Sequence, residues 1–372
     1  MSKVKLGDVA IEHKETCKGS KDGYPIVGLE HLVSEEVTLT AWDEGSDNTF
    51  TKMFRKGNVL FGRRRAYLKK AAVAPFDGIC SGDITVIEAI PDRILPELLP
   101  FIIQNDELFD FAVGKSAGSL SPRVKWEHLK NYEFELPDMD KQRELAELLW
   151  AMDATKKSYQ KLIAATDELV KSQFMEQFGD PNSNPLSWPT ATIGEICDIK
   201  SGTTLPAAKE NEGGEIAYIK VADMNIPGNE KYITTSTKFV SATTAGNGVF
   251  PIGTVVFPKN GAAVATNKKR ITHVPTCVDL NTMGVTPRIK IDEQYLYLWF
   301  QLLNLDSISL VSAIPQISAK TMGAQVIMLP PLDLQEQFAA FVQQSDKSKF
   351  ELEQALSELA ATYKRIIAEN LG

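Results

Sequence analysis

Residues 141–178 read KQRELAELLWAMDATKKSYQKLIAATDELVKSQFMEQF and are the strongest indication of the architecture. This stretch contains no glycine or proline, and its apolar residues recur from Leu145 to Phe178 at the three- and four-residue spacing of a helix. At a rise of 1.5 Å per residue, a helix of about 38 residues is roughly 57 Å long, which exceeds the width of a small domain. We therefore expect a rod that extends beyond any one globular core.

The same helical pattern returns at the end of the chain, from Asp333 onwards, with apolar residues such as Phe338, Leu352 and Ile366. Either helix alone would leave a long apolar stripe in water, so we expect the two to pair as an antiparallel coiled coil. Gly179-Asp180-Pro181 ends the first helix because glycine and proline interrupt helical structure.

The segments that precede the two helices also repeat one another in the same order. The matched strings are Leu6-Gly7-Asp8-Val9 with Ile193-Gly194-Glu195-Ile196, residues 56–61 (KGNVLF) with 252–257 (IGTVVF), Ser121-Pro122-Arg123-Val124-Lys125 with Ile314-Pro315-Gln316-Ile317-Ser318, and Leu136-Pro137 with Leu329-Pro330. Gln142 and Gln335 match at the same offset. Each string is weak alone, but their common order indicates a duplicated unit.

Short β-type runs interrupted by Gly, Pro and Asn fill both repeats, together with one helical stretch in each. This pattern predicts an α+β (mixed α/β) fold with an internal pseudo-two-fold duplication. We expect a first globular domain at 1–137, a first long helix at 138–180, a linker and second globular domain at 181–331, and a second long helix at 332–372.

The composition of the 372 residues, with 43% hydrophobic and 24% charged residues, is typical of soluble globular proteins. No apolar run approaches the ~20 residues needed to cross a bilayer, and the N-terminus lacks the apolar core of a signal peptide. We therefore expect a cytoplasmic protein without a membrane partner. Four cysteines and four histidines are scattered without the spacing of a metal site, so we predict none.

Signatures of catalysis are missing from the sequence. Residues 57–62 (GNVLFG) have the glycine spacing of a Walker A loop, but Arg63-Arg64 stands where Lys and Ser/Thr are required. There is no G-x-G-x-x-G and no Asn-Pro-Pro-aromatic tetrad of adenine methyltransferases. Residues 137–141 (PDMDK) resemble a nuclease motif, yet an N-terminal helix cap explains them. We predict no catalytic residues; an enzyme with unrecognised motifs stays a rival hypothesis.

The net charge of −8 argues weakly against nucleic acid as a partner, whereas its distribution argues for it. No acidic residue lies between Asp47 and Asp77, or between Glu230 and Asp279, and both windows are rich in Lys and Arg. Two such windows at matching places of a repeat favour nucleic-acid binding over a solvated charged surface. The helices instead carry acids such as Glu144, which suit protein partners.

The candidate DNA contacts comprise cations suited to phosphates and, through Arg, to base edges, amides able to read adenine, and one aromatic residue. They are Lys52, Arg63, Arg64, Arg65, Tyr67, Lys69, Lys70, Lys115, Arg123, Lys125, Lys259, Asn260, Asn267, Lys268, Lys269, Arg270, Gln316 and Lys320.

Over essentially its whole length the chain resembles the specificity subunit of type I restriction-modification systems. The strings that carry the likeness are residues 57–61 (GNVLF) with 64–70 (RRAYLKK), 218–225 (YIKVADMN), and Leu136-Pro137 and residues 329–332 (LPPL) before the helices. The first helix begins at residues 138–142 (DMDKQ) and departs from the double-proline form more common in that family.

The resemblance implies a non-catalytic reader of double-stranded DNA. Each globular domain would read half of an asymmetric, interrupted target from the major groove, and the helices would seat two methylation subunits. S-adenosylmethionine would belong to these subunits, and ATP and Mg to restriction subunits, so this chain would hold no cofactor. A coiled-coil scaffold with two protein-binding domains and no DNA remains the alternative. A salt titration separates the two hypotheses, because DNA binding through the basic windows must weaken steeply as salt concentration rises.

Overall fold

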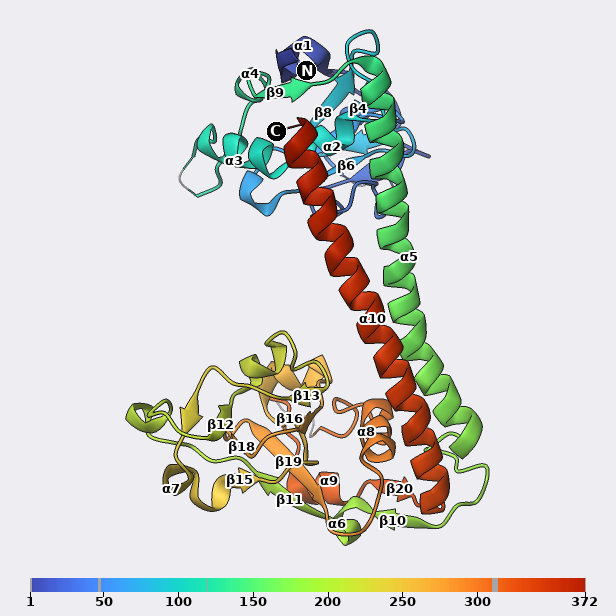
Figure 1. Ribbon diagram of the computed structural model, residues 1–372, viewed down its shortest axis with the longest axis vertical. Helices are drawn as coiled ribbons and strands as arrows, with labels where there is room; N and C mark the ends of the chain where they lie inside the picture. Colours follow the sequence, from blue (N-terminus) through green and yellow to red (C-terminus); the bar gives the residue numbers. More distant parts are fainter. Residues whose placement is uncertain (1, 46–47, 119, 310–313, 372) are drawn as a thin grey trace. The chain divides into compact units, whose positions relative to one another are not determined.

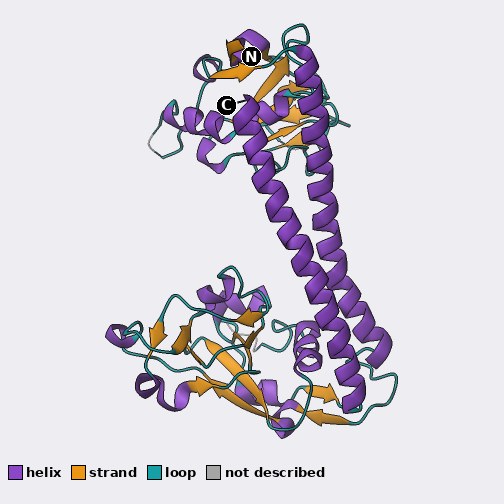
Figure 2. Cartoon of the chain, in the orientation of Figure 1, coloured by secondary structure: helices purple, strands orange, loops and turns teal. Residues whose placement is uncertain are grey.

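The computed structural model describes residues 2–45, 48–118, 120–309 and 314–371. Two compact units are formed, one by Met1–Leu162 with Glu351–Gly372 and the other by Ile163–Phe350 (Figure 1). Each unit contains short strands, short helices and a segment of both long helices (Figure 2). The predicted α+β class is therefore confirmed.

The two long helices are α5 (Met139–Phe178) and α10 (Leu332–Leu371), each of 40 residues. The start of α5 is capped by Asp138, whose Oδ1 accepts a hydrogen bond from the backbone N–H of Lys141 at 2.9 Å. Each helix is divided between the two units, because its apolar stripe completes the core of each.

The first unit contains three small sheets. The largest has the order β2 (Ala10–Glu12), β8 (Ile84–Ala89), β5 (Val59–Gly62), β6 (Ala71–Val73), all antiparallel. A second has the order β3 (Ile26–Val27), β7 (Gly78–Cys80), β4 (Lys52–Phe54), and β1 (Ser2–Lys5) pairs with β9 (Glu133–Leu136). The short helices are α1 (Leu6–Val9), η1 (Ala66–Leu68), α2 (Leu99–Ile103), α3 (Asp106–Gly114) and α4 (Trp126–Leu129).

The second unit repeats this plan with additions. Its largest sheet has the order β11 (Cys197–Ser201), β19 (Thr282–Pro287), β16 (Val255–Pro258), β17 (Arg270–Thr272), β13 (Tyr232–Ile233). The next has the order β14 (Phe239–Val240), β12 (Ile216–Ile219), β18 (Thr276–Val278), β15 (Val249–Phe250), and β10 (Thr190–Thr192) pairs with β20 (Val326–Met328). The short helices are α6 (Ile193–Ile196), η2 (Ala207–Lys209), η3 (Val221–Asn225), α7 (Ala242–Ala245), η4 (Gly246–Gly248), η5 (Gly261–Thr266), α8 (Glu293–Leu302) and α9 (Ala319–Gly323).

The matched glutamines show how closely the duplication is kept. Gln142 donates to the carbonyl of Pro137 at 2.9 Å and accepts the N–H of Leu95 at 2.8 Å. Gln335 donates to the carbonyl of Pro330 at 2.8 Å and accepts the N–H of Asp292 at 3.0 Å. Both side chains are buried, and each ties the first turn of a long helix to its globular part. The internal repeat predicted from the sequence is therefore confirmed.

The core of the first unit includes both long helices. Leu145 and Leu149, near the start of α5, share an apolar cluster with Ile367 and Leu371 at the end of α10. The helix segments are consequently antiparallel in this unit, as predicted. Trp150 packs edge-on against a phenylalanine of α2 with ring centroids 5.0 Å apart, and its Nε1 donates to the carbonyl of Glu97 at 2.9 Å.

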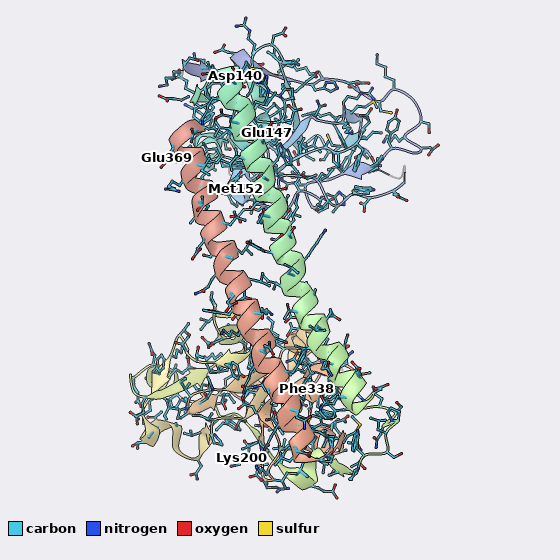
Figure 3. All side chains as sticks on the ribbon, turned by 45° about the vertical axis from the view of Figure 1, so that its right-hand side comes forward. Asp140, Glu147, Met152, Lys200, Phe338 and Glu369 are labelled. Atoms are coloured by element: carbon cyan, nitrogen blue, oxygen red, sulfur yellow. The ribbon has the colours of Figure 1, made fainter. Side chains whose placement is uncertain are left out.

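An aromatic cluster organises the core of the second unit. Phe174 and Phe178, at the end of α5, surround Phe338, near the start of α10, with ring centroids 5.7 and 5.5 Å from it. Tyr295 of α8 stacks on Phe174 at 5.4 Å. The helix segments are antiparallel here too, and Lys349 pairs with Asp167 across them at 2.8 Å. Figure 3 labels Phe338 on α10.

Candidate nucleic-acid interface

The first basic cluster forms where residues 63–65 leave β5. Residues 121–125 run alongside as an antiparallel neighbour, and Arg64 lies opposite Arg123. The carbonyl of Arg63 accepts the N–H of Val124 at 3.0 Å, and the N–H of Arg65 donates to the carbonyl of Pro122 at 2.8 Å. Two segments about 60 residues apart in the sequence thus present their cations together.

Asp83 holds two of these arginines. Its Oδ1 accepts from Arg123 Nε at 2.7 Å, and its Oδ2 accepts from Arg123 Nη2 at 3.2 Å and Arg64 Nη1 at 3.4 Å. Hydrogen bonding from Arg123 lowers the pKa of the Asp83 carboxyl below its ordinary value. Arg64 also donates through Nε to the hydroxyl of Ser121. The result is a partly exposed group of two guanidiniums and one carboxylate.

Arg63 is partly buried, and its Nε has no hydrogen-bond partner among the described residues. The other predicted residues of this unit fall into two groups. Arg65, Tyr67, Lys115 and Lys125 are exposed, and Tyr67 presents 54% of its surface to solvent. Three lysines are held by the protein: Lys52 donates to the carbonyl of Ile84 at 2.7 Å, Lys70 donates to that of Leu29 at 2.7 Å, and Lys69 pairs with Asp106 at 2.5 Å. The exposed group and the arginines of the Asp83 cluster are therefore the better candidates for ligand contact.

In the first unit, the backbone bonds between residues 63–65 and 122–124 form what we call the frame. The second unit reproduces this frame. Asn260 lies opposite Gln316 in an antiparallel bridge, and the N–H of Gly261 donates to the carbonyl of Pro315 at 2.8 Å. The carbonyl of Lys259 accepts the N–H of Ile317 at 2.8 Å. These bonds are the counterparts of those around Arg64 and Arg123, so the sequence match of residues 121–125 with 314–318 is also a structural match.

Side chains on this second frame are amides rather than guanidiniums. Asn260 Nδ2 donates to Asn281 Oδ1 at 3.4 Å, and Asn281 Nδ2 donates to Asp279 Oδ2 at 3.1 Å. The Oδ1 atom of Asn260 is buried and has no hydrogen-bond partner within the described part of the chain. Gln316, opposite Asn260, is exposed, and so is Lys320 of α9.

Lys269 does not lie on the surface, contrary to what its place in a basic window indicated. Its side chain is 0% exposed, and its ammonium donates to the carbonyl of Leu303 at 2.6 Å and to Asn267 Oδ1 at 2.7 Å. Desolvation by burial lowers its pKa to about 8. Backbone carbonyls can satisfy a buried cation, so absence of acids in a sequence window does not imply exposure.

The neighbours of Lys269 are also engaged in holding the fold. Arg270 is half-buried and donates to the carbonyl of Met224 at 3.0 Å. Lys268 donates to the side chain of Asn225, while Asn267 accepts the N–H of Leu305 at 2.9 Å. Lys259 is 9% exposed. In the second unit the exposed candidates are therefore concentrated around Asn260, Gln316 and Lys320 rather than spread along the basic window.

Sequence reasoning missed Asp83 and Asn281, which lie between the predicted residues of each frame. The carbonyl of Asp83 accepts the N–H of Arg63 at 3.0 Å, and that of Asn281 accepts the N–H of Lys259 at 2.8 Å. Both residues stand immediately before the equivalent strands β8 and β19. Aligning the repeats through these strands would have identified them.

Glu30, His31 and Asp43 bring potential metal-ligand atoms within 4.8 Å of one another. However, Nδ1 of His31 accepts the backbone N–H of Gly28 at 2.9 Å, which places the proton of the neutral ring on Nε2. That nitrogen lies 3.5 Å from Asp43 Oδ2. The geometry fits a histidine that stabilises a turn and pairs with an exposed acid.

None of the helices in the described ranges combines the length and apolar character that crossing a bilayer requires.

Comparison with known proteins identifies the family. A model of the type I restriction modification DNA specificity domain matches residues 1–165 and 185–360. The chain therefore belongs to the type I restriction-modification DNA specificity family, as its sequence features predicted.

Two solved structures share the fold. One, from work on complex assembly and conformational transition of the type I restriction-modification system, has a TM-score of 0.63 at 22% identity, covering 99% of this chain and 96% of its own. The other is a type I restriction-modification S subunit from M. genitalium, with a TM-score of 0.57 at 15% identity, covering 98% of this chain and 94% of its own. Both likenesses extend over the two globular parts and both long helices.

Proposed function

We propose that this chain is the non-catalytic DNA-reading subunit of a type I restriction-modification complex and that it recognises a two-part, interrupted target. The observation that carries the proposal is the duplicated frame around Arg64–Arg123 and Asn260–Gln316. Each unit presents one partly exposed set of hydrogen-bonding side chains from equivalent backbone positions. Two such sets in one chain suit a target with two half-sites.

The long helices support a role in holding partner subunits. Exposed acids follow both helices, among them Asp140 and Glu147 of α5 and Glu369 of α10 (Figure 3). Exposed apolar side chains accompany them: Leu148 and Leu169 on α5 and Phe350 on α10. Acidic surfaces repel DNA, and exposed apolar residues favour protein contacts. We infer that methylation subunits, two per chain, and restriction subunits dock there.

The chemistry of modification and cleavage belongs, in this proposal, to those partners. The methylation subunits would hold S-adenosylmethionine, and the restriction subunits would hold ATP and Mg. This chain's own residues would supply recognition and position the partners on DNA.

A salt titration of DNA binding tests the proposal. The full chain, assembled with its methylation subunits, is titrated with a duplex that carries the methylated target of the host. We expect the logarithm of the binding constant to fall linearly with the logarithm of salt concentration, because phosphate contacts release counterions. Lys125→Ala should reduce the slope by about one phosphate contact.

The matched control is Arg93→Ala, which removes a cation from an exposed site of the same unit outside the duplicated frame. It should leave affinity and slope unchanged. Assembly without salt-sensitive binding of the duplex would refute the proposal and favour a scaffold that binds only proteins.

A further inference from the structure

The two units carry different chemistry at equivalent positions. Arg64 and Arg123 of the first frame correspond to Asn260 and Gln316 of the second, because each pair forms the same isolated antiparallel bridge. Asp83 corresponds to Asn281, whose carbonyl makes the same backbone hydrogen bond in the second frame. The backbone hydrogen bonds are the same in the two units, but all three side chains differ.

In the first frame the carboxylate fixes the orientation of a guanidinium. Asp83 occupies Nε and Nη2 of Arg123, and Nη1 makes no hydrogen bond to another described residue. A guanidinium carries donors only, and held in this way it presents its free end as a fixed donor pair. In the major groove the base that offers two adjacent acceptors is guanine, through N7 and O6.

The same carboxylate argues against a phosphate contact at this position. Asp83 accepts from both Arg64 and Arg123, so the three groups together carry a single positive charge, with an anion at their centre. The carboxylate weakens the attraction of these arginines for a phosphate, whereas it buttresses an arginine that reads a base edge. Arg65 and Lys125 are exposed, and neither side chain pairs with an acid among the described residues, so they suit the phosphate role.

In the second frame all three of these positions carry an amide side chain: Asn260, Asn281 and Gln316. An amide offers one donor group and one acceptor, which matches N7 and the N6 amino group of adenine. Gln316 and Asn281 are exposed, so their amide groups are accessible to a base edge, whereas Asn260 donates to Asn281 at 3.4 Å and holds that amide in place.

We propose that the position formed by Arg64, Asp83 and Arg123 selects a G·C base pair and that the equivalent position, formed by Asn260, Asn281 and Gln316, selects an A·T base pair. This inference rests on the DNA-reading function proposed above. The two half-sites then differ at corresponding places because one backbone frame displays two different side-chain sets.

Reciprocal exchange of the two sets tests the inference. The first variant combines Arg64→Asn, Asp83→Asn and Arg123→Gln, and the second combines Asn260→Arg, Asn281→Asp and Gln316→Arg. Each chain is assembled with its methylation subunits and bound to a duplex library in which both half-sites are randomised. Sequencing of the bound fraction gives the preference at each position.

The wild-type complex should require G·C at one position of the first half-site and A·T at one position of the second. The first variant should change the former preference to A·T, a shift of about 5- to 150-fold, and leave the second half-site unaltered. The second variant should do the reverse. If a triple variant fails to assemble, Arg123→Gln alone should still lower the G·C preference in the first half-site only.

The control, Arg65→Asn with Lys125→Gln, should weaken binding to all sequences evenly. Uniform weakening by the exchange variants, with both preferences intact, would overturn the inference but leave the DNA-reading proposal standing. A wild-type complex without any sequence preference would overturn both.

Discussion

Lys269→Met is the substitution that tests most directly how the second basic window is built. Methionine keeps nearly the same length of side chain but carries no charge. Because the ammonium of Lys269 is buried, we expect the stability difference between this variant and the wild type to depend on pH.

The magnitude follows from the pKa of the buried group. Burial lowers this pKa from 10.5 to about 8, so the unfolded chain binds more protons than the folded chain between these values. The stability of the wild type therefore rises with pH across that window. Below pH 8 the folded state bears the full cost of the buried charge, about 3 kcal/mol. Between about pH 7 and pH 9.5 some 2 kcal/mol of this cost should disappear.

Urea denaturation of both proteins at several pH values measures the effect. Hydrogen bonds lost in the variant add an offset that does not change with pH, so the slope of the difference isolates the titration. Lys320→Met, at an exposed lysine of the same unit, is the matched control for removal of a lysine. A difference between Lys269→Met and wild type that stays constant over this range would show that the ammonium is not desolvated and would refute the burial account.

Two further predictions concern residues whose local contacts stabilise the backbone. Gln142→Leu and Gln335→Leu should each destabilise the protein by about 2 kcal/mol in urea denaturation, because each leaves one N–H and one carbonyl unpaired. The control Gln344→Leu, at an exposed position, should change stability by less than about 0.5 kcal/mol. Equal effects of all three substitutions would contradict the pairing argument. Gly202→Ala should destabilise by about 2–3 kcal/mol, since its Cβ would lie 2.1 Å from a backbone carbonyl oxygen. Gly19→Ala, where a Cβ meets open space, should be nearly neutral, and similar melting temperatures for the two variants would refute this steric argument.

The long helices were the part of the fold most accessible from sequence. A helical period sustained over about 38 residues without glycine or proline has few other interpretations. The division of each helix between two units was not accessible, because a periodic apolar stripe does not say what covers it. Leu145 packs in a globular core, whereas Leu148 and Leu169 on the same helix are exposed.

The candidate site could be predicted only in part. The repeat correctly placed Arg123 and Gln316 at equivalent positions, because local strings keep their order when a unit is duplicated. The basic windows were less informative, since a count of charges cannot separate an exposed arginine such as Arg65 from the buried Lys269. Which carbonyls receive the buried ammonium depends on the packing of η5 and α8, and this is a tertiary property.

Comparison of the two units separates residues that build the frame from residues that use it. Gln142 and Gln335 are identical in the two repeats, and both satisfy backbone groups that would otherwise be left unpaired at the start of a long helix. Gly7 and Gly194 both allow close approach, with an added Cβ 3.1–3.2 Å from its nearest neighbour. Arg123 and Gln316 make no such contribution: each is exposed, and its backbone alone forms the bridge. A side chain in that position can be exchanged without loss of backbone hydrogen bonds, so recognition can change while the fold is retained.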